Sequence, residues 1–227
     1  MYWIILIGFG ILSWAVSSRL KNRFREYSEV PTSSGLSGAE IAEKMLRDNN
    51  IRDVRVVSVE GELTDHYNPK NKTINLSRAV YHGRNVAAAA VAAHETGHAV
   101  QHATAYSMLQ FRSAMVPVVN LSSKLMNVIF IMAILGGAVF GLVPQMFMLI
   151  IVAQAVITLF SLVTLPVEFD ASARALQWLN MSKITVGQEY DKAKNALQWA
   201  ASTYVVATLA AITQLLYFIM AFGGGRD

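Results

Sequence analysis

The sequence predicts a mainly α-helical membrane protein, with four transmembrane helices and a small cytoplasmic α+β domain that contains a short β-sheet. The first observation is composition: apolar residues make up 54% of the chain, charged residues only 15%, and the mean hydropathy is +0.38. The second is a set of four long uncharged segments, and the third is a group of strand-like segments between the first two of them. The chain has no cysteine, which excludes disulfides and cysteine metal ligands.

The four uncharged segments are long enough to cross a bilayer. We predict transmembrane helices at residues 1–18 and 202–224, and two more within residues 125–166. This middle stretch contains no Asp, Glu, Lys, Arg or His. As a single helix it would be roughly 64 Å long, about twice a hydrocarbon core of roughly 30 Å. It is therefore expected to form a hairpin, with its turn at residues 141–145, where a glycine and a proline stand.

The distribution of basic residues predicts the topology. The first segment has no basic residue ahead of its apolar run and no clear cleavage site, which indicates a retained anchor and not a cleaved signal peptide. With four helices, residues 19–124 and 167–201 lie on one side and hold all of the 19 Lys and Arg residues except Arg226. The positive-inside rule places that side in the cytoplasm and both chain ends outside. The basic residues are spread out, so no nucleic-acid partner is expected.

The first cytoplasmic segment begins with a predicted linker and helix. Residues 28–38 are rich in Ser, Thr, Pro and Gly, which is typical of a linker. Ser37 and Glu40 form a capping-box pattern at the start of a helix over residues 38–49. The valine-rich residues 53–59 then predict a strand.

A strand, a turn and a second strand are predicted next, at residues 63–67, 68–71 and 72–77. Ile74 and Leu76 alternate with polar residues, which indicates a half-exposed strand. An open strand edge beside the helix that follows would suit an extended peptide. A small sheet that only packs against that helix is an equally favoured alternative.

Three further helices are predicted. One covers residues 85–103, with Asn85 as its N-cap, and another covers residues 191–200 and continues into the last span. The third covers residues 167–180 and is amphipathic, with an apolar face of Phe169, Ala173, Leu176 and Leu179. Residues 108–125 fit either a cytoplasmic helix or the first turns of the second span.

The helix over residues 85–103 carries a His-Glu-x-x-His pattern at residues 94–98. On a helix, His94 and His98 project from one face one turn apart, so their imidazoles can take two corners of a zinc tetrahedron. Glu95 can reach a water on the same metal and accept its proton. The same five-residue pattern also arises by chance, as two ordinary surface histidines. The small apolar residues ahead of the motif disfavour that alternative, because they predict a helix that is packed on both sides.

A catalytic zinc commonly takes three protein ligands and leaves one position for water, so the two histidines need a partner. The candidates are Glu168, His102, Asp170 and His66. Glu168 is favoured, because an even number of predicted spans separates it from the histidines and places all three on one side. A carboxylate that snorkels at the membrane interface is the alternative role for Glu168. His102 is disfavoured, since it lies roughly 6 Å further along the helix than His98.

Other polar residues are candidates for supporting roles. Asp170 is expected to accept a hydrogen bond from a histidine N–H or to pair with Arg174. His66 or Tyr67 is a candidate for stabilising the oxyanion of the transition state, with packing in the turn and sheet as the alternative.

Several longer motifs resemble a known family. They are Asp65-His66-Tyr67-Asn68-Pro69, residues 72–77, Val80-Tyr81-His82-Gly83, residues 87–101, and residues 165–176. In these the chain resembles the bacterial membrane neutral zinc metallopeptidases, the YugP-like group, over nearly its whole length. It is similar, more distantly, to the HtpX and CAAX-prenyl endopeptidase clan. That resemblance implies a zincin-like catalytic domain of the gluzincin type and a third ligand in a Glu-x-x-Ala-Asp pattern, which matches Glu168 and Ala171. Ser172 stands where that pattern has Asp.

The predicted function is an integral-membrane zinc endopeptidase with one Zn²⁺ per chain. Its active site would face the cytoplasm, in the cell membrane, and its substrate would be a peptide or protein. A membrane metal transporter or sensor is the first alternative, but the predicted spans lack charged or histidine ligands. A catalytically inactive membrane scaffold is the second, and the intact Glu95 argues against it. The oligomeric state is not predicted.

Overall fold

The computed structural model describes residues 2–136 and 144–223, and it describes their side chains except at 133–136, 144–146 and 222–223. The chain forms two compact units. One comprises Met1–Trp14, Phe111–Leu165 and Tyr204–Asp227, and the other comprises Ala15–Gln110 and Pro166–Thr203. The second unit therefore joins parts of the two segments predicted to be cytoplasmic.

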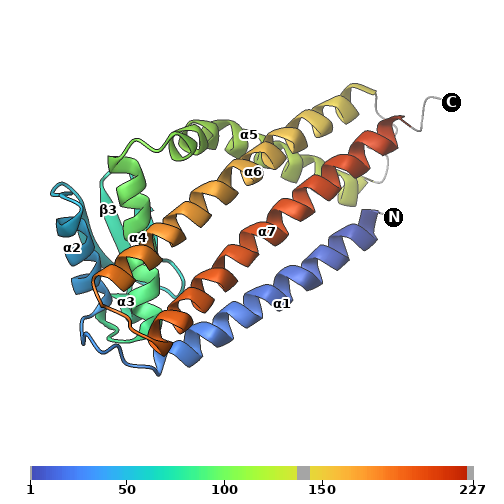
Figure 1. The fold of residues 1–227 in the computed structure, drawn as a ribbon. Coiled ribbons are helices and arrows are strands. Elements are labelled where there is room, and N and C mark those ends of the chain that lie inside the picture. The colour runs from blue at the N-terminus through green and yellow to red at the C-terminus, as the bar shows by residue number, and fades with distance from the viewer. Residues whose placement is uncertain (1, 137–143, 224–227) are drawn as a thin grey trace. The chain divides into compact units, whose positions relative to one another are not determined.

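Within the described residues, four helices are long and apolar enough to cross a membrane, which confirms the predicted number. They are α1 (Tyr2–Ser28), α5 (Ser107–Gly136), α6 (Pro144–Met181) and α7 (Gln188–Gly223) (Figure 1). Of the predicted hairpin turn, residues 141–143 lie outside the described part of the chain, and Pro144 already begins α6.

Two of these helices extend further than predicted. α1 continues from the apolar run through its basic residues to Ser28, because Lys and Arg are good helix formers. α5 begins at Ser107, so the ambiguous residues 108–125 belong to one continuous helix, with Pro117 inside it. The apolar candidate span in this helix accordingly starts at Ser107, well before residue 125.

The first unit exposes large apolar side chains and buries a few polar ones. Trp3, Ile4 and Trp14 on α1 are 59, 73 and 71% exposed, as suits a surface that faces lipid. Between α6 and α7, the side chains of Gln154 and Thr158 both donate hydrogen bonds of 3.1 Å to the backbone oxygen of Ala211. Such bonds hold apolar helices in a fixed register.

The second unit contains the short elements: α2 (Gly38–Asp48), β1 (Arg55–Val59), β2 (His66–Asn68), β3 (Thr73–Ser77), α3 (Arg78–His82) and α4 (Val86–Ala103). The predicted capping box is present, since Ser37 N–H donates to the Glu40 carboxylate (2.7 Å) and Glu40 N–H donates to the Ser37 hydroxyl (3.3 Å). The predicted linker, helix and strand-turn-strand are confirmed with small shifts in their ends. β2 starts only at His66, because Gly61 and Leu63 adopt positive φ angles of 99° and 56° and form a turn.

The predicted half-exposed strand is wrong. β3 is the central strand of a three-stranded sheet in the order β1-β3-β2, parallel to β1 and antiparallel to β2. Ile74 and Leu76 are fully buried, and the polar Thr73 and Ser77 are only 5 and 1% exposed. A strand with neighbours on both edges and helices beside it buries both of its faces, which its alternating sequence does not reveal.

The part of α6 in the second unit also differs from its predicted face. The helix continues through Pro166. Its buried residues include Val167, Ala171, Ala175 and Leu179, each fully buried. Phe169, expected on the apolar face, is 49% exposed.

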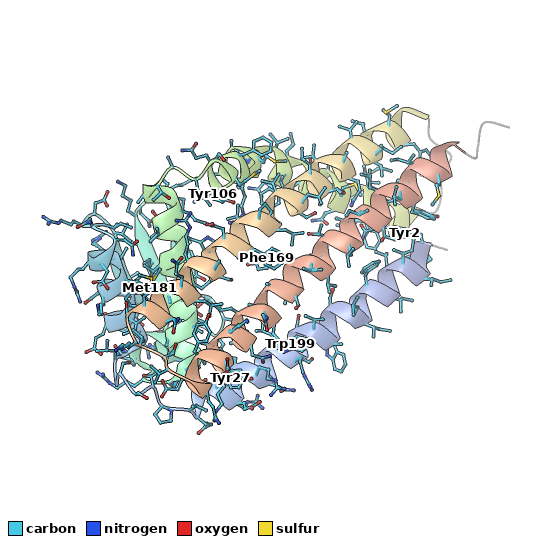
Figure 2. All side chains as sticks on the ribbon, viewed as in Figure 1. Tyr2, Tyr27, Tyr106, Phe169, Met181 and Trp199 are labelled. Atoms are coloured by element: carbon cyan, nitrogen blue, oxygen red, sulfur yellow. The ribbon has the colours of Figure 1, made fainter. Side chains whose placement is uncertain are left out.

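Within the second unit, α1 lies beside α7 (Figure 1). The Tyr27 hydroxyl donates a 2.9 Å hydrogen bond to Asn195, and the Arg19 guanidinium lies 5.9 Å from the centre of the Trp199 ring. Figure 2 labels Tyr27 of α1 and Trp199 of α7. The apolar core lies around α4 and includes Ile41, Met45, Ile74, Leu76, Val80 and Leu179.

Candidate metal centre

The two histidines of the motif lie on α4, which is buried almost all round. Asn85 caps this helix as predicted, because its side-chain oxygen accepts from Ala88 N–H at 2.9 Å. Six alanines follow in the first three turns, and all six are at most 1% exposed. A helix with such small side chains allows other elements to approach its backbone closely, so the motif lies in a packed interior.

α4 and α6 meet at Gly97 and Ala171. A Cβ atom at position 97 would lie 2.6 Å from the backbone oxygen of Ala171, so only glycine fits there. This close approach brings Glu168 and Ser172, which lie one turn apart on α6, to the histidines of α4.

His94, His98 and Glu168 form a group that could hold a metal ion. One ligand atom from each lies within 4.8 Å of the others. Glu168 Oε2 is 3.3 Å from His94 Nε2 and 3.6 Å from His98 Nε2. The side chains of His94, His98 and Glu168 are 13, 10 and 3% exposed. At zinc bond lengths of about 2.0–2.1 Å, tetrahedral ligand atoms lie roughly 3.3 Å apart, so the donor set and its spacing fit zinc.

The other ring nitrogens of the histidines have protein partners. His94 Nδ1 is 3.1 Å from the Ser172 hydroxyl, and His98 Nδ1 is 3.0 Å from Gln101 Oε1. Each Nε2 therefore faces the shared carboxylate. Sequence reasoning missed both Gln101 and Ser172 as partners. The three-residue spacing of His98 and Gln101 on one helix was an available signal, but the contact of Ser172 with His94 depends on the helix crossing.

Asp170 was expected to orient a histidine directly or to pair with Arg174. The structure shows the pair, with Arg174 Nε donating to Asp170 Oδ2 at 2.5 Å. Its link to a histidine is indirect, because Asp170 Oδ2 accepts from Gln101 Nε2 at 2.8 Å, and Gln101 contacts His98.

Glu95 lies next to this group and is held by the sheet. It is 8% exposed, and its Oε2 accepts a 3.0 Å hydrogen bond from the backbone N–H of Tyr67 on β2. The Tyr67 hydroxyl is 2.8 Å from His102 Nδ1. The other two candidates lie outside the three-ligand group. His102 contacts Tyr67, and the ring of the exposed His66 lies 2.8 Å from the carbonyl of nearby Thr64.

The pKa values of two groups near the site are shifted. Burial opposes the charged form of His98, but the hydrogen bond and negative charge of Glu168, with the charge of Glu95, outweigh it and raise the pKa of His98. Burial raises the pKa of Asp65, against the hydrogen bonds that it accepts from the Ser77 backbone N–H (2.7 Å) and hydroxyl (3.2 Å). Those two bonds fix the loop that leads into β2, and so position Tyr67 beside Glu95.

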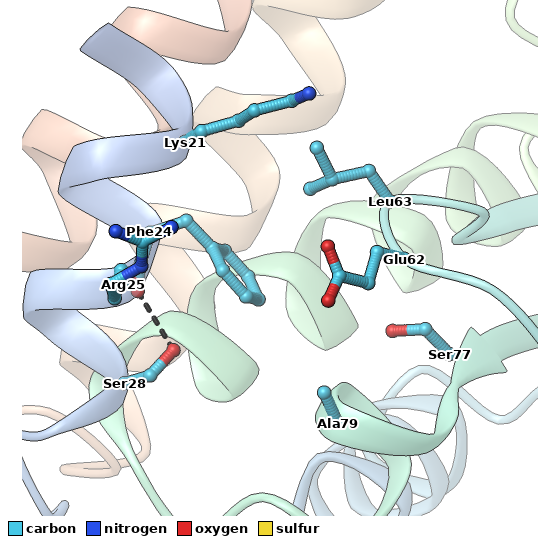
Figure 3. Close-up of a pocket in the computed structure, with 8 residues that line it drawn as sticks. All are labelled: Lys21, Phe24, Arg25, Ser28, Glu62, Leu63, Ser77 and Ala79. Atoms are coloured by element: carbon cyan, nitrogen blue, oxygen red, sulfur yellow. Dashed lines mark hydrogen bonds between the residues drawn. The ribbon is translucent and has the colours of Figure 1, made fainter. Parts of the chain in front are cut away.

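The second unit also contains a pocket of about 210 Å³ that is separate from the metal-ligand group. Lys21, Phe24, Arg25 and Ser28 of α1 line it together with Glu62, Leu63, Ser77 and Ala79 (Figure 3). Its lining combines two basic side chains with one acidic one, and none of the candidate catalytic or metal-binding side chains borders it.

Known proteins are similar to this chain over nearly its full length. Residues 2–223 match the family described as "Putative neutral zinc metallopeptidase". The chain is similar to the "Putative membrane protease YugP" of Bacillus subtilis (strain 168), with 40% identity over 224 residues, 99% of this chain and 97% of the relative. No solved structure matches the chain significantly. From a match over nearly its full length, the chain belongs to the neutral zinc metallopeptidase family.

Proposed function

We propose that the chain is an integral-membrane zinc endopeptidase, with one Zn²⁺ held by His94, His98 and Glu168. The observation that carries this proposal is the group of two imidazole nitrogens and one carboxylate oxygen within 4.8 Å, with Glu95 beside it on the same helix. Two His and one Glu form a donor set that catalytic zinc uses, because three protein ligands leave a position for water.

Glu95 is the proposed general base, and then the general acid towards the leaving amine. Zinc bound at the three ligands would polarise the attacking water and the scissile carbonyl. The Tyr67 N–H donates to Oε2 of Glu95 and so fixes the orientation of the carboxylate. The other oxygen, Oε1, is the one we assign to proton transfer.

The substrate is proposed to be an extended peptide that pairs with the outer edge of β2. Tyr67 opposes Ile74 of β3, but its N–H is directed to Glu95 and not into the sheet. The open edge of β2 therefore passes beside the proposed base, where a peptide added as a further strand would be cleaved. For the oxyanion we propose the Tyr67 hydroxyl, which contacts His102, in preference to the exposed His66, which contacts the Thr64 carbonyl.

We place the protein in the cell membrane, with both termini outside and the active site facing the cytoplasm. Four apolar helices and the name of the Bacillus relative support a membrane protein. The basic residues supply the orientation, since all but Arg226 belong to the segments on the predicted cytoplasmic side.

A Glu95→Gln variant tests the function. It should bind zinc as the wild type does, because Glu95 is not a ligand, and it should lose casein cleavage by about 10²- to 10⁴-fold, the usual contribution of a general base. Glu62→Gln, an exposed Glu→Gln change away from the site, is the matched control and should cleave normally. Cleavage by Glu95→Gln at the wild-type rate would refute the mechanism. Zinc content and chelator-sensitive cleavage by the wild type separate the peptidase from a transporter or an inactive scaffold.

A further inference from the structure

Gln101 is a buried amide that connects the two ligand-bearing helices. Its side chain is fully buried at the end of α4. Its Oε1 lies 3.0 Å from His98 Nδ1, and its Nε2 lies 2.8 Å from both the Val167 backbone oxygen and Asp170 Oδ2. All three polar contacts of this amide are therefore made inside the protein.

The chemistry of these partners fixes the orientation of the amide. The Val167 carbonyl can only accept a hydrogen bond. The Asp170 carboxylate, which also accepts from Arg174 Nε at 2.5 Å, is likewise an acceptor. Both acceptors require the amide NH₂ on their side. The carbonyl end of Gln101 must then face His98 Nδ1, and an amide oxygen can only accept.

We propose that Gln101 is a positioning residue that locks His98 in one tautomer. With an acceptor at Nδ1, the neutral ring carries its proton there, and the lone pair of Nε2 is directed at Glu168 and the metal. This inference rests on the proposed metal site. It adds a specific role for a residue whose hydrogen bonds span α4 and α6.

The two histidines differ in this respect. His94 Nδ1 contacts the Ser172 hydroxyl, which can either donate or accept. Ser172 therefore tolerates both tautomers of His94, whereas Gln101 selects one tautomer of His98. Gln101 also binds the carbonyl directly before Glu168 in the chain, so a single side chain aligns a nitrogen ligand and the segment that carries the oxygen ligand.

The test uses the full chain in detergent with Co²⁺ in the metal site, where paramagnetic shifts separate the imidazole N–H protons from other signals. The wild type should show a slowly exchanging His98 N–H. Gln101→Met has a similar size, but its thioether sulfur is only a weak acceptor. This variant should speed exchange of that proton at least about tenfold and weaken Co²⁺ binding about 10- to 100-fold, as loss of an outer hydrogen bond to a ligand does. Ser172→Ala is the matched variant: it should change exchange of the His94 proton and leave the His98 proton slow.

A rescue variant protects the test against a folding defect. Gln101→Glu restores an acceptor for His98 but removes the donor to the Val167 carbonyl. Asp170→Asn in the same chain removes the carboxylate repulsion and supplies an amide donor. This double variant should recover the slow His98 proton. The proposed role of Gln101 is wrong if either variant shows that His98 N–H exchange and Co²⁺ affinity do not depend on an acceptor at position 101. A wild type that binds no Co²⁺ would instead refute the proposed metal site, and the lock with it. Loss of peptide cleavage alone would leave the metal-binding result standing, so the two failures are distinguishable.

Discussion

At the scale of single residues, the third ligand is the point on which the proposed site depends. Glu168 is almost fully buried, and its Oε2 faces both histidine Nε2 atoms. His102 lies on the same helix as the histidines but contacts Tyr67. We therefore expect Glu168→Ala to lower zinc affinity by more than about 100-fold, beyond the effect of removing an outer hydrogen bond. His102→Ala should keep its zinc. Competition with a zinc-binding dye measures both, and the reverse result would make His102 the ligand.

The raised pKa of His98 gives a pH dependence at the same scale. A ligating imidazole must be neutral, so zinc displaces the proton that Glu168 and Glu95 stabilise on His98. The raised pKa extends this competition above the ordinary imidazole value of about 6.5. Apparent zinc affinity should fall with decreasing pH by about tenfold per unit for each proton displaced. Zinc titrations from pH 8 to pH 5, corrected for protonation of the competing chelator, measure this slope. A flat profile would exclude a histidine ligand.

At the scale of elements, the crossing of α4 and α6 assembles the site. The atom that a Cβ at position 97 would meet is backbone oxygen of Ala171, which cannot rotate away. Gly97→Ala should therefore force the helices apart and weaken zinc binding. It should also lower the denaturation temperature, because overpacking costs about 1–3 kcal/mol of folding stability. Gly10→Ala, where nothing lies within 4 Å, is the control and should do neither. Zinc affinity and thermal denaturation of both variants decide the matter; normal zinc binding by Gly97→Ala would mean that the crossing is adjustable.

Local patterns predicted most elements, because caps and periodicity are properties of a short segment. Asn85 and the alanines after it marked α4, and Ser37 with Glu40 marked the start of α2. Burial was harder to predict, since it depends on partners that are distant in the chain. β3 is buried because β1 and β2 flank it, and Phe169 is exposed because Val167, Ala171 and Ala175 occupy the inner face of α6. The same limit applies to the site: its histidines were evident in the sequence, but the contact of Ser172 with His94 joins residues 78 positions apart.

At the scale of the whole molecule, the membrane orientation decides which proteins the peptidase can meet. The chain lacks cysteine, so single cysteines report accessibility without background. Arg52→Cys, an exposed position in the second unit, should be labelled by a membrane-impermeant maleimide only after the membrane is opened. Asp227→Cys should be labelled in right-side-out spheroplasts, because four spans return the chain to the outside. Blocking with the impermeant reagent before lysis, followed by a mass-tagged maleimide, measures both on one gel.

Labelling of Arg52→Cys in sealed spheroplasts would reverse the orientation and make the substrates extracytoplasmic. Protection of both Arg52→Cys and Asp227→Cys in sealed spheroplasts would put the two positions on one side of the membrane, and so contradict the three spans expected between them.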